Sequence, residues 1–218
     1  MEMRLLSAAQ RPLSFEELGM LEDTIKVIED NIKKTFGMIL VSGPTGSGKS
    51  TTLYSILNVL NRPEVNVVTI EDPIEYNIKY VNQTQINPAA GITFASALRS
   101  LLRQDPNIIL VGEIRDGETA DIAVNAALTG HLLLSTVHTN DAATVVPRLL
   151  DMKVPPFLVA AVMNVALAQR LVGKICSDCI ESYKPEPRLL DLIQKQIEEM
   201  KIENYNPPKV LYKGRGCK

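Results

Sequence analysis

Residues 43–51 form a glycine-rich segment between an apolar run and a helix-forming stretch, and this segment constrains the fold more than any other feature. The apolar run, residues 38–41, reads Met-Ile-Leu-Val. A strand, a tight glycine turn and a helix in succession make the arrangement in which a helix N-terminus binds phosphate. The segment consists of Gly43, Pro44, Thr45, Gly46, Ser47, Gly48, Lys49, Ser50 and Thr51. It predicts a strand–loop–helix unit of an α/β fold.

Each part of this segment has its own role in binding a nucleoside triphosphate. The glycines let backbone N–H groups turn toward the phosphates, Lys49 supplies a positive charge to the β- and γ-phosphates, and the Ser50 hydroxyl can bind Mg²⁺. A glycine-rich turn without a ligand is the alternative. The complete match in a strand–loop–helix setting favours a site for ATP and Mg²⁺.

Other apolar runs predict a mainly parallel sheet. Three nearly continuous runs without alternation are typical of strands buried on both faces, and these are residues 65–70, 108–111 and 131–137. Helices are expected between strands at residues 94–103 and 118–128. Such alternation predicts a sheet with right-handed crossovers and flanking helices, in which ligands bind beyond the carboxyl ends of the strands.

Two further segments have weaker patterns. Ser14 and Glu17 have the spacing of a capping box, so a helix is expected to begin near Ser14, with Gly19 as a point of interruption and Gly37 as a stop. We expect this helix to cover one edge of the sheet. Residues 77–86 are polar and short, and they fit either a hairpin or an edge strand.

The composition limits the partners of the chain. Lys and Arg number 23 and Asp and Glu number 25 in 218 residues, so the net charge of −2 gives no positive field for nucleic acid. The longest apolar stretch, residues 157–168, contains Asn164 and is shorter than the roughly 20 residues that cross a bilayer. The N-terminus lacks the apolar region of a secretory signal. We expect a cytoplasmic protein with no membrane span and no direct nucleic-acid partner.

Glu113 follows the predicted strand at residues 108–111. A carboxylate at the carboxyl end of a buried strand is where phosphate-loop enzymes carry the acid that binds Mg²⁺ or orients the attacking water. An exposed pair with Arg115 is the alternative.

A second acidic group follows the predicted strand at residues 65–70 and comprises Glu71, Asp72 and Glu75. We expect one of them to polarise the attacking water, with a solvated turn as the alternative. Carboxylates this close repel one another unless a cation lies nearby, and this favours Mg²⁺.

The two histidines, His131 and His138, bracket one predicted strand, and only one of them can lie at its carboxyl end. His138 is therefore the candidate to contact the γ-phosphate, whereas His131 fits a structural role equally well. Three arginines are candidates to stabilise developing charge, although arginine on a helix surface is the commoner case; these are Arg99, Arg103 and Arg115.

Five blocks of this sequence together resemble the secretion ATPases of type II secretion and type IV pilus assembly. The blocks are residues 43–51, 69–76, 102–107, 111–116 and 130–141. Four of them resemble the Walker A, Asp box, Walker B and His box motifs of that family, and the resemblance runs almost from end to end. It implies a RecA-like P-loop NTPase domain in a homo-hexameric motor. It also implies inner-membrane platform and accessory proteins as partners, at the inner face of the cytoplasmic membrane.

The resemblance implies roles that agree with those argued from position. By position they are Lys49 and Ser50 on phosphate and metal, Glu113 as the Walker B acid, Glu71 and Glu75 as Asp-box acids, and His138 as the nucleotide-sensing histidine.

The cysteines indicate a subfamily. Cys176 and Cys179 have Cys-x-x-Cys spacing, which in a cytoplasmic protein indicates metal or redox chemistry, and Cys217 is the third cysteine. A structural zinc site needs four ligands, so this set is expected to be cut short, and the sequence is compatible with a bound or an empty Zn²⁺ site. Secretion and pilus-assembly ATPases resemble this tail, whereas the pilus-retraction relatives lack it. Assembly or secretion is therefore favoured.

We expect three parts in the chain: residues 1–13 as the end of a preceding N-terminal domain, residues 14–172 as the RecA-like ATPase domain, and residues 173–218 as a Cys-containing zinc-type module with a charged helix at 189–202. Two other functions are open. One is a related P-loop motor for conjugation or DNA uptake, which the charge disfavours. The other is a nucleotide-binding scaffold without turnover, against which Glu113, Glu71 and His138 argue.

Overall fold

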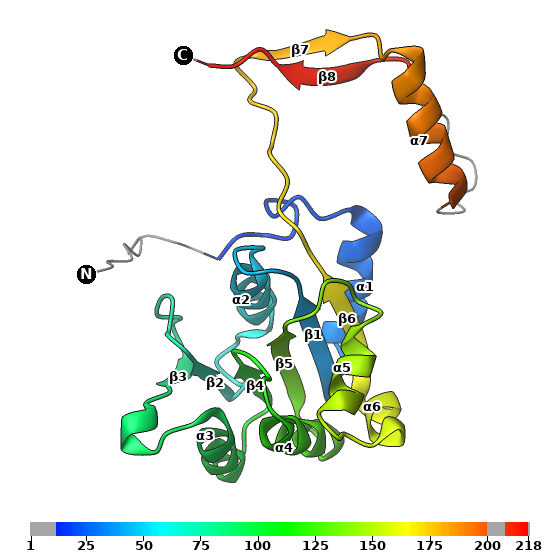
Figure 1. Cartoon of the computed structure of the whole chain (residues 1–218). Coiled ribbons are helices and arrows are strands. Elements are labelled where there is room, and N and C mark those ends of the chain that lie inside the picture. Colours follow the sequence, from blue (N-terminus) through cyan, green and yellow to red (C-terminus); the bar gives the residue numbers. More distant parts are fainter. Residues whose placement is uncertain (1–11, 200–207, 218) are drawn as a thin grey trace. The chain divides into compact units, whose positions relative to one another are not determined.

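A six-stranded parallel sheet forms the centre of the first of two structural units (Figure 1). The computed structural model describes residues 12–199 and 208–217, and the chain divides into the two units between Leu171 and Val172. In spatial order the strands are β3 (Val81–Gln85), β2 (Val67–Glu71), β4 (Ile108–Val111), β5 (Leu132–Val137), β1 (Gly37–Ser42) and β6 (Met163–Ala168). Every neighbouring pair is parallel, so all six carboxyl ends lie at one end of the sheet. This confirms the predicted fold class.

The four inner strands are buried along their whole length, as their continuous apolar runs predict. Successive side chains of a strand point to opposite faces, and the core accordingly has two halves. Met38 and Leu40 of β1 belong to one half, and Ile39 and Val41 belong to the other. The strands that position the candidate site are thus fixed by packing on both sides.

Helices cover both faces of the sheet. Residues of α1 (Glu22–Ile32) and α2 (Lys49–Leu60) complete one half of the core. The helices α3 (Phe94–Leu101), α4 (Gly117–Leu128), α5 (Val145–Asp151) and α6 (Pro156–Val162) complete the other. Two 3₁₀ turns, η1 (Pro88–Ala90) and η2 (Leu102–Gln104), flank α3. Thr93 caps α3 through a capping box with Ser96, and Asp116 caps α4 by accepting from the Thr119 N–H.

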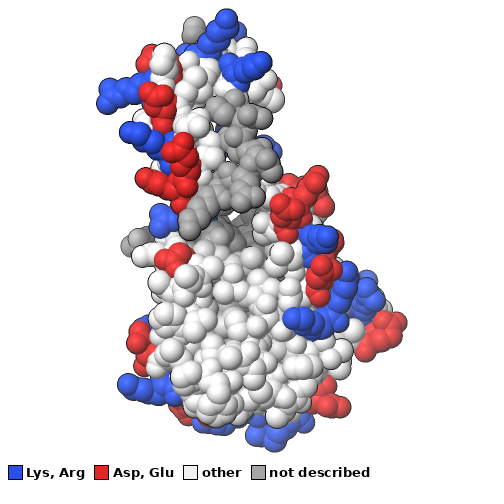
Figure 2. Space-filling view, turned by 90° about the vertical axis from the view of Figure 1, so that its right-hand side faces the viewer, with Lys and Arg blue, Asp and Glu red and all other residues white. Residues whose placement is uncertain are grey.

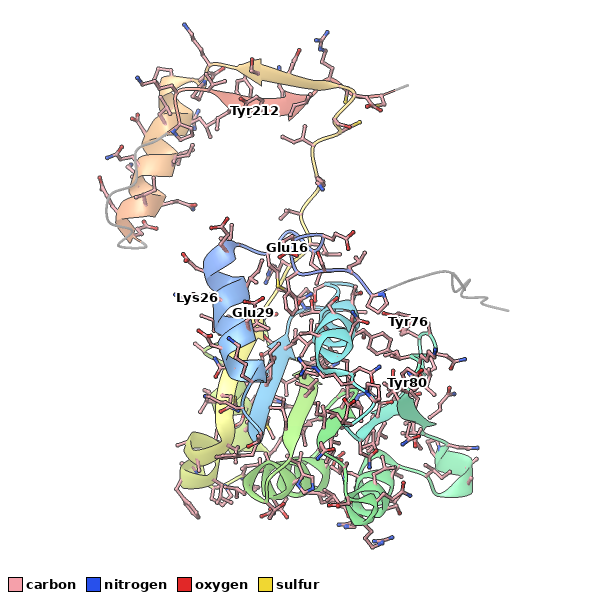
Figure 3. The ribbon with its side chains drawn as sticks, turned by 180° about the vertical axis from the view of Figure 1, so that it is seen from behind. Glu16, Lys26, Glu29, Tyr76, Tyr80 and Tyr212 are labelled. Atoms are coloured by element: carbon pink, nitrogen blue, oxygen red, sulfur yellow. The ribbon has the colours of Figure 1, made fainter. Side chains whose placement is uncertain are left out.

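The predicted helix start at Ser14 is wrong, although its capping box forms. The Ser14 N–H donates to Glu17 Oε2 at 2.9 Å, and the Glu17 N–H donates to Ser14 Oγ at 3.2 Å. This box closes a single turn, because Gly19 adopts the left-handed region with φ 76° and the helix α1 begins only at Glu22. From there α1 packs Ile28 and Ile32 into the core beside β6, while Lys26 and Glu29 lie on its outer face (Figure 3).

Two other segments differ in how far the sequence predicted them. Within residues 77–86 the structure forms β3, a parallel edge strand, so the hairpin alternative is wrong. The apolar stretch 157–168 divides into most of α6 and the whole of β6, and neither element was predicted. A continuous apolar run has no periodicity that separates a buried helix from a buried strand.

In its described residues, 172–199 and 208–217, the second unit contains a two-stranded antiparallel sheet and one helix. The strand β7 (Ile180–Tyr183) pairs with β8 (Leu211–Gly214), and α7 (Pro187–Glu199) lies between them in the chain. The charged helix predicted at 189–202 agrees with α7 up to Glu199, and its last residues lie outside the described part. Of the helices in the described ranges, none is long and apolar enough to cross a membrane.

Candidate functional site

The glycine-rich loop lies where the sequence predicts it, between the end of β1 and the start of α2. Gly48 is the N-cap of α2, with φ 86° and no side-chain cap, so the first N–H groups of the helix are available to an anion. Gly43, with φ 140°, approaches its neighbours closely, because a Cβ there would lie 2.5 Å from the Gln169 carbonyl oxygen. Both positions need glycine for backbone reasons, as a phosphate-binding loop requires.

Lys49 folds back over this loop. Its Nζ donates to the carbonyl oxygens of Gly43 at 2.9 Å and Pro44 at 3.0 Å. Burial lowers the pKa of the Lys49 ammonium, and the negative charge of Glu113 works against this shift. A polyanion above the loop would favour the charged ammonium in the same way that Glu113 does. Ser50 is exposed in the first turn of α2, whereas the Ser47 hydroxyl is buried and has no hydrogen-bond partner among the described residues.

Glu113, Arg115 and His138 meet beyond the carboxyl ends of β4 and β5. Arg115 Nη2 lies 2.6 Å from Glu113 Oε1, and His138 Nε2 lies 3.2 Å from Glu113 Oε2. The Glu113 side chain is largely buried, while Arg115 and His138 are exposed. The strand order brings Glu113 and His138 together because β4 and β5 are neighbours. Glu113 thus forms the ion pair with Arg115 that the sequence offered as the alternative to a catalytic role. It also contacts His138, which that alternative did not include.

Glu71 ends β2 with a different set of partners. Its Oε2 accepts a hydrogen bond from the Tyr54 hydroxyl of α2, and its Oε1 accepts from Thr69 Oγ1 at 2.5 Å and from Gln83 Nε2 at 3.1 Å. Glu71 and Tyr54 are both buried. Burial of the Tyr54 hydroxyl, together with its hydrogen bond to the Glu71 carboxylate, raises the pKa of that hydroxyl. Glu71 is therefore held by neutral donors from α2, β2 and β3.

The other acids of this group lie in the connection after β2. Asp72 is exposed and Glu75 is half-buried, and the Glu75 N–H donates to the Tyr54 hydroxyl at 3.4 Å. Tyr76 packs edge-on against Tyr54, with ring centroids 4.6 Å apart, and Figure 3 shows it beside α2. Within the described residues these carboxylates do not form a three-ligand group tight enough for one metal ion.

The remaining basic candidates lie away from the loop. His131 precedes β5, at the amino end of the sheet, and its Nδ1 lies 2.9 Å from the Ala126 carbonyl oxygen of α4. Arg99 forms an exposed ion pair with Glu118 at 2.8 Å, and Arg103 donates to the Arg99 carbonyl oxygen at 3.0 Å. These contacts join α3 to α4 and bind backbone carbonyls near the ends of these helices.

Three residues that contact the site were not predicted. Tyr54 and Gln83 hold Glu71, and Gln169, directly after β6, contacts the glycine-rich loop. Gln169 lies 122 positions from Ser47, its hydrogen-bond partner, and Gln83 comes from an edge strand. The position of Tyr54 near the site could have been predicted from the sequence, because Tyr54 lies in α2, the helix that starts at the glycine-rich loop.

The three cysteines come together in the second unit. All three Sγ atoms lie within 4.8 Å of one another, with Cys176 and Cys217 at 3.4 Å. The pairing of β7 with β8 explains this, because Cys179 precedes β7 and Cys217 follows β8. A hydrogen bond from the Asp178 N–H, and a smaller one with Cys217, lower the pKa of Cys176, whereas Cys176 raises the pKa of Cys217. Clustered thiolates are ligands that suit Zn²⁺, so the donor set fits that ion.

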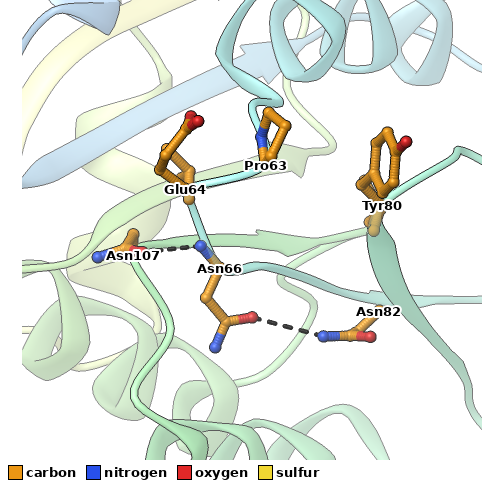
Figure 4. A pocket seen from close by; sticks show the side chains of 8 residues that line it. Pro63, Glu64, Asn66, Tyr80, Asn82 and Asn107 are labelled. Atoms are coloured by element: carbon orange, nitrogen blue, oxygen red, sulfur yellow. Dashed lines mark hydrogen bonds between the residues drawn. The ribbon is translucent and has the colours of Figure 1, made fainter.

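A separate open hollow of about 580 Å³ lies at the amino ends of β2, β3 and β4 (Figure 4). The Asn66 N–H donates to Asn107 Oδ1 at 2.8 Å, and Asn82 Nδ2 donates to Asn66 Oδ1 at 3.4 Å. Ligands of parallel sheets bind at the opposite, carboxyl ends, where the glycine-rich loop lies. We therefore place the candidate site at the loop and not in this hollow.

Comparison with known proteins gives one consistent result. The family model for "Type II/IV secretion system protein" matches residues 1–218. The chain is 49% identical over 215 residues to the type IV pilus assembly ATPase PilB of Thermus thermophilus, covering 99% of this chain and 24% of that protein. It is 48% identical over 215 residues to the type II secretion system ATPase E of Vibrio cholerae, covering 99% of this chain and 41% of that protein.

Solved structures agree with the sequence comparison. The pilus retraction motor PilT with bound ADP superposes with a TM-score of 0.68 at 34% identity, covering 91% of this chain and 60% of that one. The chain therefore spans less than half the length of these two curated relatives and about three-fifths of the PilT chain.

Proposed function

Because this chain belongs to the type II/IV secretion system protein family, we propose that it is the ATP-hydrolysing part of a motor for type II secretion or type IV pilus assembly. The observation that carries this proposal is the position of Glu113 and His138 at the same end of the sheet as Lys49 and its loop. Phosphoryl transfer needs a phosphate cradle and a carboxylate in one place, and the ends of β1, β4 and β5 supply both.

In this proposal each group has one task. N–H groups of the glycine-rich loop and of the first turn of α2 would bind the phosphates, Lys49 would leave the loop carbonyls for the β- and γ-phosphates, and Ser50 would ligate Mg²⁺. Mg²⁺ neutralises charge on the phosphates when it is bound. Glu113 would orient the attacking water or help to hold Mg²⁺, and its partners Arg115 and His138 are exposed enough to turn toward the γ-phosphate.

Of the Asp-box acids, Glu71 acts through Tyr54 in this scheme. Both of its oxygens already accept hydrogen bonds, so it holds α2 and the connection after β2 in place. Glu75 belongs to that connection, and its N–H is fixed by the same Tyr54 hydroxyl. We assign the direct acidic role of this box to Glu75.

The motor is proposed to be a homo-hexamer that works with inner-membrane platform and accessory proteins at the cytoplasmic face of the membrane. A broad face of the first unit, over β6 and α6, is free of charged side chains (Figure 2). Apolar residues are exposed on the neighbouring helices, including Phe157 of α6 at 71% and Val146 of α5 at 39%. Such a surface favours contact with other protein. Residues 14–172 would be the ATPase domain and 173–218 a separate module.

Turnover across a wide range of protein concentration tests this proposal. We expect MgATP hydrolysis per chain to rise with concentration, because assembly by mass action completes a site shared between subunits. Glu113→Gln is the blank. Equal turnover in the parent chain and Glu113→Gln at every concentration would contradict the proposal.

Nucleotide binding can be tested without turnover. Lys49→Ala is expected to abolish tight MgATP binding, because the only ammonium of the loop is lost. Calorimetry measures the affinity, and an affinity equal to that of the parent chain would contradict the role of the loop.

We further propose that the cysteine cluster binds Zn²⁺ independently of the nucleotide. Cys176→Ser and Cys179→Ser are each expected to lower the zinc content per chain while leaving the MgATP affinity unchanged. Elemental analysis and calorimetry measure the two quantities, and zinc content equal to that of the parent chain would contradict a thiolate site.

A further inference from the structure

Gln169 joins the edge of the sheet to the glycine-rich loop. Its N–H donates to the Ser42 carbonyl oxygen at 3.1 Å, which extends the pairing of β6 with β1 by one residue beyond Ala168. This backbone bond places Gln169 beside Gly43, where its carbonyl oxygen leaves no room for a Cβ. The position of Gln169 is therefore set by the sheet and not by the loop.

The side-chain amide of Gln169 makes two hydrogen bonds, one from each end. Nε2 donates to the Ser47 carbonyl oxygen at 2.6 Å, and Oε1 accepts from the Thr52 hydroxyl at 2.8 Å. Ser47 lies in the loop and Thr52 in the first turn of α2, where it is buried. The Gln169 amide thus connects the loop and the start of α2 to the end of β6, the edge strand that pairs with β1.

The bond to Ser47 determines the direction of a phosphate-facing group. In a trans peptide unit the C=O and the next N–H point in opposite directions. With the Ser47 carbonyl turned toward Gln169, the Gly48 N–H must point away from it. No described residue accepts a hydrogen bond from the Gly48 N–H, so this donor is left for an anion at the helix N-terminus.

The bond from Thr52 frees the helix backbone. A threonine inside a helix often donates to the carbonyl four residues earlier, which competes with the backbone and bends the helix. Here the Thr52 hydroxyl donates to Gln169, and the Gly48 carbonyl oxygen accepts the Thr52 N–H at 3.0 Å. The first turn of α2 is therefore regular directly behind the loop.

We propose that Gln169 is a positioning residue for the phosphate-binding loop, holding the Ser47 carbonyl and the Thr52 hydroxyl so that the Gly48 N–H faces the nucleotide phosphates. This inference rests on the proposed nucleotide site. Gln169 does not touch the nucleotide, and it acts through the peptide that it orients.

Calorimetric titration of the 218-residue chain with MgADP tests the inference at a temperature where every variant is folded. Gln169→Met keeps the length of the side chain and removes both hydrogen bonds, and we expect its MgADP affinity to fall about 10-fold or more, which is about 1.4 kcal/mol. Thr52→Val keeps the shape and removes one bond, so a smaller loss is expected. Thr52→Ser restores the hydroxyl and should restore the affinity.

The controls separate positioning from stability and from the proposed function. Gln104→Met makes the same change on an exposed residue at the amino end of the sheet, and it should leave the affinity unchanged. Unchanged affinity in folded Gln169→Met and Thr52→Val, with only the melting temperature lowered, would overturn the inference while the nucleotide site stands. If Gln169→Met does not fold, the Thr52→Val and Thr52→Ser pair decides. Absence of MgADP binding by the parent chain would overturn the proposed function itself, and the inference with it.

Discussion

Glu113 follows β4 and Glu71 ends the neighbouring strand β2, yet their surroundings have opposite characters. Glu113 pairs with Arg115 and His138, two basic side chains that are exposed to solvent. Glu71 is buried, and its oxygens accept hydrogen bonds from the neutral groups of Tyr54, Thr69 and Gln83. One carboxylate has partners that are free to move, and the other has partners fixed by packing.

This difference shows that a position at a strand end does not by itself make a carboxylate reactive. The partners of Glu113 are solvent-exposed, so breaking either ion pair costs little free energy. The carboxylate oxygens can then bind a metal ion or water. The partners of Glu71 cannot leave without burying unsatisfied donors, which costs about 1–3 kcal/mol each. We therefore expect Glu113 to affect turnover and Glu71 to affect stability.

The largest effect is expected from Glu113→Gln on turnover. The amide keeps the size of the side chain and removes the charge, so MgATP hydrolysis should fall by about 100-fold or more, as on removal of a group that acts in the transition state. MgATP affinity should change little. Steady-state rates and calorimetry, at concentrations where the parent chain turns over, measure the two quantities.

Glu71→Gln provides the matched control for that experiment, because it makes the same chemical change at the other strand. Its turnover per folded chain should stay well above that of Glu113→Gln. A greater loss of turnover in Glu71→Gln would reverse our assignment of the two carboxylates.

The next effect is the loss of stability in Glu71→Gln. Both oxygens of Glu71 accept hydrogen bonds, so in Glu71→Gln the amide NH₂ replaces an acceptor in either orientation, and the hydroxyl that it faces must reverse its direction or lose the bond. We expect the free energy of unfolding to fall by about 3 kcal/mol, the upper end for a buried polar group that loses its partner. Urea denaturation of the parent chain, Glu71→Gln and Glu113→Gln measures this. An equal loss in Glu113→Gln would remove the contrast between the two sites.

A smaller loss is expected from Tyr54→Phe, which removes one donor and keeps the ring. The free energy of unfolding should fall by about 1.5 kcal/mol, because Glu71 retains its bonds from Thr69 and Gln83. A double-mutant cycle of Tyr54→Phe with Glu71→Gln should give a clear coupling energy. Additive losses would mean that the Tyr54 hydroxyl does not stabilise the carboxylate.

The sequence predicts the positions of the candidate nucleotide-site residues better than the positions of the residues that support them. Lys49, Glu113 and His138 each follow or begin an element whose apolar pattern is readable, and parallel strands bring such residues to one end of the sheet. This rule for parallel sheets predicts which residues lie at the end of a strand, but it does not predict which side chains surround them. It therefore groups Glu71 with Glu113, although the structure surrounds the two carboxylates differently.

The supporting residues depend on contacts between distant segments. Gln83 lies on the edge strand β3 and Gln169 follows the edge strand β6, and β6 belongs to an apolar stretch without a readable period. The start of α1 was mispredicted for a local reason, because the capping box at Ser14 is genuine but Gly19 turns the chain after one turn. Spacing alone does not tell whether a helix continues.

The smallest effect is expected from Arg115→Gln, which sharpens the contrast with Tyr54→Phe. Both changes remove one hydrogen-bond donor from a carboxylate, but the Arg115 side chain is 64% exposed. An exposed ion pair contributes about 0–1 kcal/mol because water and salt screen it, so the free energy of unfolding should change by less than in Tyr54→Phe. Arg99→Gln, which removes another exposed pair, is the control. Urea denaturation at low and high salt measures both, and a loss in Arg115→Gln that exceeds 1 kcal/mol and persists at high salt would show that Glu113 is held as firmly as Glu71.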